Sequence, residues 1–158
     1  YTPPPMRWEM VEIGGVRWIN DAYNASPLSM AAALRTFRET PAAGRRWLVL
    51  GGMRELGERS AAEHAALGRA VAGGDWAGLV TVGELGGGIA RAAVAAGWPA
   101  ARTAVCDDAD AAVEWLRARL APGDAVLLKG SRGERVERVL ERWRTVDGAP
   151  EAPAPRRE

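Results

Sequence analysis

Asp21, Tyr23 and Asn24 form the densest group of potential ligand-binding side chains in the sequence. They stand in DAYNASPLSM, between the alternating segment VRWIN and the helix-forming segment AAALRTFRE. Ser26 and Pro27 suit a helix start, because serine is a favoured N-cap and proline a favoured first helical residue. That capping leaves Asp21 without an expected structural role. A carboxylate can accept hydrogen bonds from two neighbouring sugar hydroxyls, and tyrosine offers a ring and a hydroxyl. The stretch therefore predicts a loop that faces a ligand.

KGSRGER is a second candidate loop, which follows the apolar run AVLL. Lys129 is the only lysine of the chain, and Ser131 and Arg132 follow it at an expected helix N-terminus. Backbone N–H groups, a hydroxyl and two cations would converge there, which favours a site for an anion or a carboxylate. The structural alternative is a serine N-cap with incidental charges.

Three other loops are better explained by local structure. GGMRELGERS has the glycine spacing of a phosphate loop. Glu58 and Arg59, however, stand where such a loop has a lysine and a hydroxyl residue. We therefore expect a turn that is followed by a helix with a Ser60–Glu63 capping box. GELGGG lacks the dinucleotide fingerprint and predicts a flexible turn. CDDAD predicts a helix start at which carboxylates offset the dipole. His64, the sole histidine, is expected on a surface helix without metal-binding neighbours, and no metal site is predicted.

The elements that must position these loops follow an alternating pattern. MRWEMVEI and VRWIN, joined by Gly14-Gly15, predict an N-terminal β-hairpin. Apolar runs and helical stretches then alternate four times. The expected strands cover about residues 45–52, 78–83, 102–106 and 124–130, and the expected helices cover residues 61–72, 85–96, 109–120 and 134–144. Solidly apolar strands are typical of a parallel sheet that is covered on both faces. We therefore expect a three-layer, Rossmann-like α/β sandwich with a mostly parallel sheet and ligands at the carboxyl ends of its strands.

Composition limits the classes of protein to which the chain can belong. Its 158 residues, 47% of them hydrophobic and 26% charged, suit one globular domain. A net charge of +1 gives no global field for nucleic acid or an anionic membrane, and no apolar run approaches the ~20 residues of a membrane span. A single cysteine, Cys106, and a start without a secretion signal favour the cytoplasm. We expect a linker over residues 1–5, one domain over 6–146 and a disordered tail over 147–158.

Three stretches together resemble the C-terminal domain of the Mur ligases, across residues 6–144. These are INDAYNASPLSM, VLGGMRELGERSAAEHAALG and VLLKGSRGERVERVLE. The resemblance is closest to the MurF branch, whose members add D-alanyl-D-alanine to UDP-N-acetylmuramoyl-tripeptide (UDP-MurNAc-tripeptide). The sequence departs from the family pattern at Ser26, where asparagine is frequent, and at Gly52, where aspartate is frequent.

The resemblance implies an ATP-dependent amide ligase of peptidoglycan synthesis. In such a ligase, ATP activates a peptide carboxylate as an acyl phosphate, which the amine substrate then attacks. The implied cofactors are ATP and Mg²⁺, which are bound mainly by a central domain that this sequence lacks. The implied partners are the N-terminal and central ligase domains, so the chain alone is expected to be inactive and to hold no catalytic residue. The implied ATP-side residues are Asp21, Tyr23 and Asn24, and the implied substrate-side residues are Ser26, Lys129, Ser131 and Arg132.

Two other interpretations remain open. One is a ligase domain like that of folylpolyglutamate synthase, against which the Y-N-A and K-G-S-R residues count. The other is a stand-alone, non-catalytic α/β module that binds a nucleotide or a partner.

Overall fold

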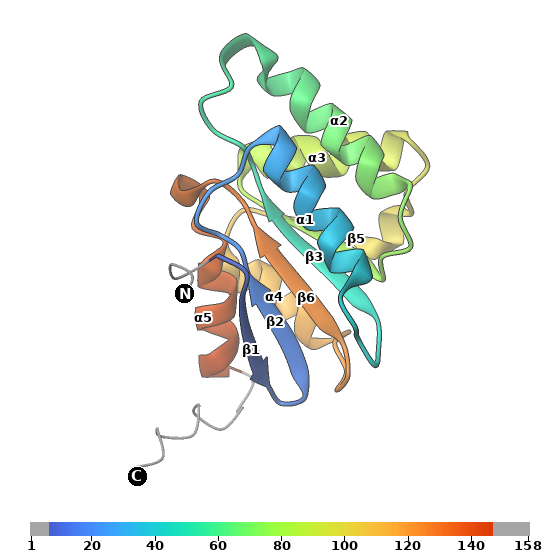
Figure 1. Ribbon diagram of the computed structural model, residues 1–158, viewed down its shortest axis with the longest axis vertical. Coiled ribbons are helices and arrows are strands. Elements are labelled where there is room, and N and C mark those ends of the chain that lie inside the picture. The colour runs from blue at the N-terminus through green and yellow to red at the C-terminus, as the bar shows by residue number, and fades with distance from the viewer. Residues whose placement is uncertain (1–6, 147–158) are drawn as a thin grey trace.

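A six-stranded sheet forms the centre of the structure, a computed structural model that describes residues 7–146 (Figure 1). The strands are β1 (Glu9–Ile13), β2 (Val16–Asn20), β3 (Arg46–Gly51), β4 (Gly78–Val82), β5 (Thr103–Cys106) and β6 (Ala125–Lys129). Their order across the sheet is β1-β2-β6-β3-β4-β5. β1 pairs with β2 in an antiparallel hairpin, and every other pair is parallel. The predicted fold class and hairpin are confirmed. The predicted linker and tail lie outside the described residues.

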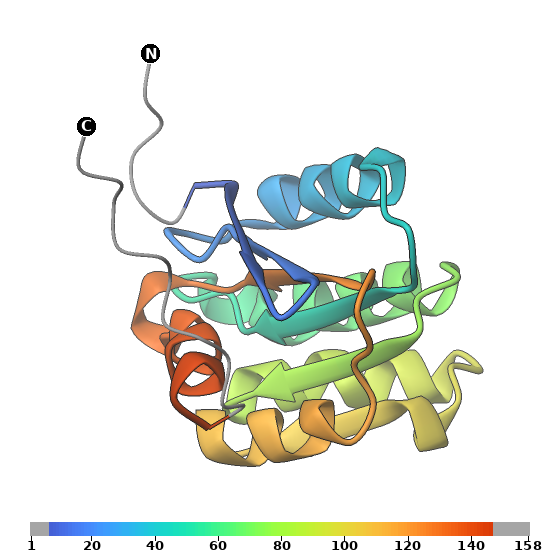
Figure 2. The same ribbon diagram turned by 90° about the horizontal axis from the view of Figure 1, so that it is seen from below.

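Helices cover both faces of this sheet (Figures 1 and 2). The five α-helices are α1 (Pro27–Glu39), α2 (Ser60–Ala72), α3 (Glu84–Ala95), α4 (Ala109–Arg117) and α5 (Glu137–Val146). α1, α2 and α3 share one apolar core with the sheet, and α4 and α5 share the other. The strand β6 shows why its sequence reads as solidly apolar. Its side chains alternate between the two cores, with Val126 and Leu128 on one side and Ala125 and Leu127 on the other, and all four are buried.

The GELGGG segment forms the first turns of α3, as the helix expected over residues 85–96 requires, and not the flexible turn that its glycines predicted. Gly83 is the N-cap of α3, and Gly86 and Gly87 lie buried inside that helix. A Cβ at Gly86 would stand 3.3 Å from the carbonyl oxygen of Leu50 and from Cβ of Thr81, so the absent side chain lets α3 lie close to the sheet. Glycine has a low helix propensity, which is why the local sequence predicted a turn. Tertiary packing decides the conformation here.

Helix starts agree with the sequence at two positions and differ at two others. Ser26 caps α1, as predicted, and α4 starts in CDDAD, as predicted, with Asp108 as its N-cap. The predicted Ser60–Glu63 capping box is wrong, because a 3₁₀ turn (η1, Gly57–Arg59) runs directly into α2 and Ser60 is already helical. The last helix begins later than predicted, because a second 3₁₀ turn (η3, Arg132–Glu134) and a left-handed Arg135 precede α5.

Candidate functional site

Three loops that are far apart in the sequence meet at the carboxyl edge of the sheet. β6 lies between β2 and β3, so the segments 21–26, 130–136 and 52–57 leave neighbouring strands and lie side by side. The loop after β5, with Asp107, leaves the outermost strand on the other side of β4. The candidate site is therefore the joint edge of β2, β6 and β3, where ligands of open α/β sheets bind.

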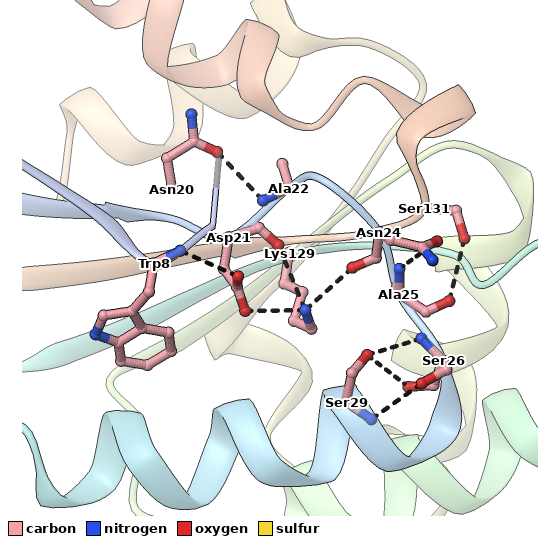
Figure 3. A network of polar contacts seen from close by, with 10 residues as sticks. All are labelled: Trp8, Asn20, Asp21, Ala22, Asn24, Ala25, Ser26, Ser29, Lys129 and Ser131. Atoms are coloured by element: carbon pink, nitrogen blue, oxygen red, sulfur yellow. Dashed lines mark hydrogen bonds and ion pairs between the residues drawn. The ribbon is translucent and has the colours of Figure 1, made fainter. Parts of the chain in front are cut away.

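Lys129 holds the centre of this edge (Figure 3). Its Nζ lies 2.9 Å from Oδ2 of Asp21 and donates to the carbonyl oxygens of Asn24 at 3.1 Å and Asp21 at 3.5 Å. The other carboxylate oxygen of Asp21 accepts the backbone N–H of Trp8 at 3.1 Å. The Lys129 side chain is 5% exposed and that of Asp21 is 18% exposed. The ion pair is thus largely withdrawn from water, and it ties together three segments of the chain.

This geometry gives Asp21 and Lys129 structural contacts that the sequence did not predict. Asp21 has a structural role, because it neutralises a buried ammonium and binds the segment before β1. Lys129, expected to contact the substrate, directs its three donors to acceptors within the chain. The carboxylate of Asp21 still lines an open cleft, and each of its oxygens has a lone pair to spare for a ligand.

The other predicted residues of the two loops lie around this pair. Asn24 turns its Oδ1 onto the N–H of Ala25 at 2.8 Å, which shapes the loop. The hydroxyl of Ser26 accepts the N–H of Ser29 at 3.1 Å within a capping box. Ser131 is buried; its Oγ accepts the N–H of Arg54 at 2.8 Å and donates to the carbonyl oxygen of Ala25 at 3.5 Å, so it connects all three loops. The predicted row of helix N–H donors behind Ser131 is absent among the described residues, because η3 is a 3₁₀ turn of three residues.

A cleft of about 590 Å³ opens beside the buried pair, between the loop after β2 and the first turns of α1. Asp21, Asn24, Ser26 and Lys129 line it, together with Arg7 and Tyr23. The ring of Tyr23 is flanked by two guanidinium groups, that of Arg7 at 4.1 Å and that of Arg132 at 5.6 Å. Stacked guanidinium groups keep their charge and present several N–H donors, so this mouth suits a phosphate or a carboxylate.

Arg7 was missed by the sequence-based reasoning. It precedes the first strand, and the alternation in MRWEMVEI assigned it to the hairpin. The signal that could have found it is the predicted hairpin itself, because its antiparallel register pairs Glu9 with Asn20 and so brings the segment before β1 to the carboxyl end of β2.

The loop after β3 is held by a buried histidine. His64 is 3% exposed, so the predicted surface position is wrong. Its Nε2 accepts the N–H of Met53 at 2.8 Å, and its Nδ1 lies 2.7 Å from the carbonyl oxygen of Ser60, which assigns the proton to Nδ1.

A Cβ at Gly52 would overlap Cβ of Leu85 and stand 3.0 Å from Oε1 of Glu134. The glycine at this position therefore has a packing reason, since Leu85 and Glu134 fill the space that a side chain would need.

Other features of the described residues point to no second chemistry. No group of three or more histidine, cysteine or acidic side chains gathers to hold a metal within residues 7–146. Burial, with the nearby Asp108 and Asp107, raises the pKa of the Cys106 thiol. None of the helices in this part of the chain has the length and apolar character needed to cross a membrane.

Residues 6–132 match the family model "Mur ligase, glutamate ligase domain". The chain is 42% identical, over 80% of its length, to the UDP-N-acetylmuramoyl-tripeptide–D-alanyl-D-alanine ligase of Mycobacterium tuberculosis, of which it covers 28%. Its fold is similar to that of the MurF ligase from Thermotoga maritima in complex with ADP (TM-score 0.76, 30% identity, 90% of this chain and 31% of that one). MurF from Acinetobacter baumannii shares the fold (TM-score 0.78, 24% identity, 90% of this chain and 31% of that one). The chain thus spans less than a third of the length of each relative.

Proposed function

This chain belongs to the family of Mur ligase C-terminal, glutamate ligase domains, and from that premise we propose that it completes the nucleotide site of an ATP-dependent amide ligase. The ligase joins D-alanyl-D-alanine to UDP-MurNAc-tripeptide in peptidoglycan synthesis. The observation that carries the proposal is the cleft beside the loop after β2, whose lining combines the Asp21 carboxylate, the exposed Tyr23 and the Arg7 guanidinium. The guanidinium of Arg132, from the loop after β6, lies over the same Tyr23 ring. A relative with the same fold was solved with ADP, which supports a nucleotide as one occupant.

We assign Asp21, Tyr23 and Asn24 to the nucleotide side. Asp21 lines the cleft and keeps free lone pairs for ribose hydroxyls. Tyr23 is 38% exposed as a residue, so its side chain is accessible to a planar base. Asn24 contributes through the loop, because its side-chain oxygen is already bound to the N–H of Ala25.

We assign Ser26 and Arg132 to the amine-substrate side. The Ser26 hydroxyl lines the cleft and can still donate its proton. Among residues 7–146, no carboxylate lies within 4 Å of the Arg132 guanidinium, so this cation is available for the terminal carboxylate of D-alanyl-D-alanine. The sequence also assigned Ser131 and Lys129 to the amine-substrate side. Their polar groups are bound within the chain, so we assign them the support of the loops.

The proposal assigns the remaining chemistry to the rest of the ligase. When bound, ATP supplies the phosphoryl group that activates the peptide carboxylate. The described residues contain no cluster of three or more histidine, cysteine or acidic side chains that could hold Mg²⁺. The N-terminal and central domains of the relatives are the implied partners, since this chain covers less than a third of them. ATP and a UDP-linked precursor as substrates imply work in the cytoplasm.

A chimera tests this proposal. Residues 6–146 would replace the matching C-terminal segment of the Mycobacterium tuberculosis relative, and phosphate release would be followed with ATP, UDP-MurNAc-tripeptide and D-alanyl-D-alanine. We expect the chimera to release phosphate only when all three substrates are present. The isolated chain, and the relative cut before the same segment, should stay at background.

The alternatives give different outcomes in the same assay. Turnover by the isolated chain would overturn its assignment as a completing domain. A folded chimera that is no faster than the truncated relative would favour a stand-alone binding module. A chimera that accepts glutamate in place of D-alanyl-D-alanine would favour the folylpolyglutamate-synthase-like interpretation.

A further inference from the structure

Lys129 is enclosed by the loop that it contacts. Its ammonium group has three protons and three acceptors, namely Oδ2 and the carbonyl oxygen of Asp21 and the carbonyl oxygen of Asn24. The whole residue is 4% exposed. A ligand could reach the ammonium only if one of these contacts were given up, and a charge that loses its partners in a buried position is costly.

The same contacts bend residues 21–24 around the ammonium group of Lys129. Two carbonyl oxygens of this short segment, those of Asp21 and Asn24, accept from Nζ, so the segment curls about the ammonium (Figure 3). Tyr23 lies between them in sequence and is exposed. Its ring is the one over which the guanidinium groups of Arg7 and Arg132 lie. The position of the ligand-facing side chains thus depends on a group that lies 108 residues away in sequence.

The segment before β1 is held through the same pair. Trp8 has a left-handed backbone (φ 49°), which a non-glycine residue keeps only where its surroundings hold it. Its N–H donates to Oδ1 of Asp21, whose other oxygen faces Lys129. Arg7 is the residue next to Trp8, so its place over Tyr23 also follows from the pair.

We propose that Lys129 is a positioning residue, whose buried ammonium holds residues 21–25 and the Arg7–Trp8 segment in the form that binds ligand. Which ligands this form takes rests on the proposed function. The positioning itself does not, because it concerns contacts within the chain. A direct substrate contact by Lys129 is the competing role.

Amide hydrogen exchange of the isolated chain tests the positioning without any activity. Lys129→Met keeps the length of the side chain and removes its charge. We expect the Trp8 and Ala25 amides to exchange at least about tenfold faster in this variant, while amides in the middle of α3 change less. Arg138→Ala, which removes an exposed cation from α5 that has no ion pair with residues 21–25 in the described part of the chain, is the control and should leave both amides unchanged. Equal changes at Trp8, Ala25 and α3 would overturn the proposal.

Two further variants and one kinetic measurement complete the test. If Lys129→Met does not fold, Asp21→Asn serves instead, since it removes the charge of the partner at constant volume. The same local increase at Trp8 and Ala25 is expected, and its absence contradicts the proposal. In the chimera, a positioning role predicts that Lys129→Met raises KM for both ATP and D-alanyl-D-alanine, whereas a rise for one substrate alone would indicate direct contact. If the unmodified chimera is inactive, the proposed function fails, and the exchange experiment still decides the role of Lys129.

Discussion

Asp21→Ala is expected to lower the free energy of unfolding of this chain by about 3–5 kcal/mol. The substitution leaves the ammonium of Lys129, whose side chain is 5% exposed, without its counter-charge, and it removes the acceptor of the Trp8 N–H. Single domains have a stability of about 5–15 kcal/mol, so the variant should remain folded at low temperature and melt early. Chemical denaturation followed by circular dichroism measures the loss.

Asp107→Ala is the matched control for this prediction. Asp107 is an exposed aspartate that also follows a strand at the carboxyl edge, and in the described residues it has neither an ion pair nor a capping bond. Its removal should change stability by less than about 0.5 kcal/mol. Similar small losses for both variants would contradict a buried, energetically significant Asp21–Lys129 pair. In the chimera, Asp21→Ala should in addition raise KM for ATP, because the same carboxylate lines the cleft.

Arg132→Ala is expected to weaken the use of D-alanyl-D-alanine by the chimera. Arg132 is exposed and lies over Tyr23, and no carboxylate neutralises it within residues 7–146. A hydrogen bond between charged groups contributes about 1.5–3 kcal/mol, so kcat/KM for this substrate should fall by about ten- to a hundredfold. KM for ATP should change little. Arg138→Ala removes another exposed cation, in the first turn of α5, and should leave both values unchanged. If KM for ATP shifts alone, Arg132 belongs to the nucleotide side.

The sequence predicted the strands and most helices of this fold because their patterns are local. Glycine-linked alternation marks the hairpin, and the runs around β3, β4 and β6 are apolar throughout because both of their faces are buried. The loops at the carboxyl ends followed from the same reasoning. The α3 glycines misled it, because their value lies in contacts with Leu50 and Thr81 that only the folded chain makes.

The arrangement within the site depends on contacts that no local pattern carries. Sequence alone does not say that β6 inserts between β2 and β3, and without this order Lys129 and Asp21 are two unrelated charges. His64 was expected at the surface because the sequence of its helix does not show which side chains a neighbouring loop covers. In the structure, the loop after β3 covers His64 and buries it. The sequence thus predicted which residues gather at the site. It did not predict which of them face the ligand and which hold the loops in place.

Nucleotide-dependent hydrogen exchange in the chimera tests the central claim most directly, namely that the nucleotide meets this domain at the joint edge of β2, β6 and β3. Exchange would be measured with and without saturating ADP for residues 21–25 and, as an internal control at the same edge of the sheet, for residues 107–112 after β5. The account predicts slower exchange in residues 21–25 and no change in residues 107–112. Protection of residues 107–112 alone, or unchanged exchange in residues 21–25 while ADP is bound, would contradict it.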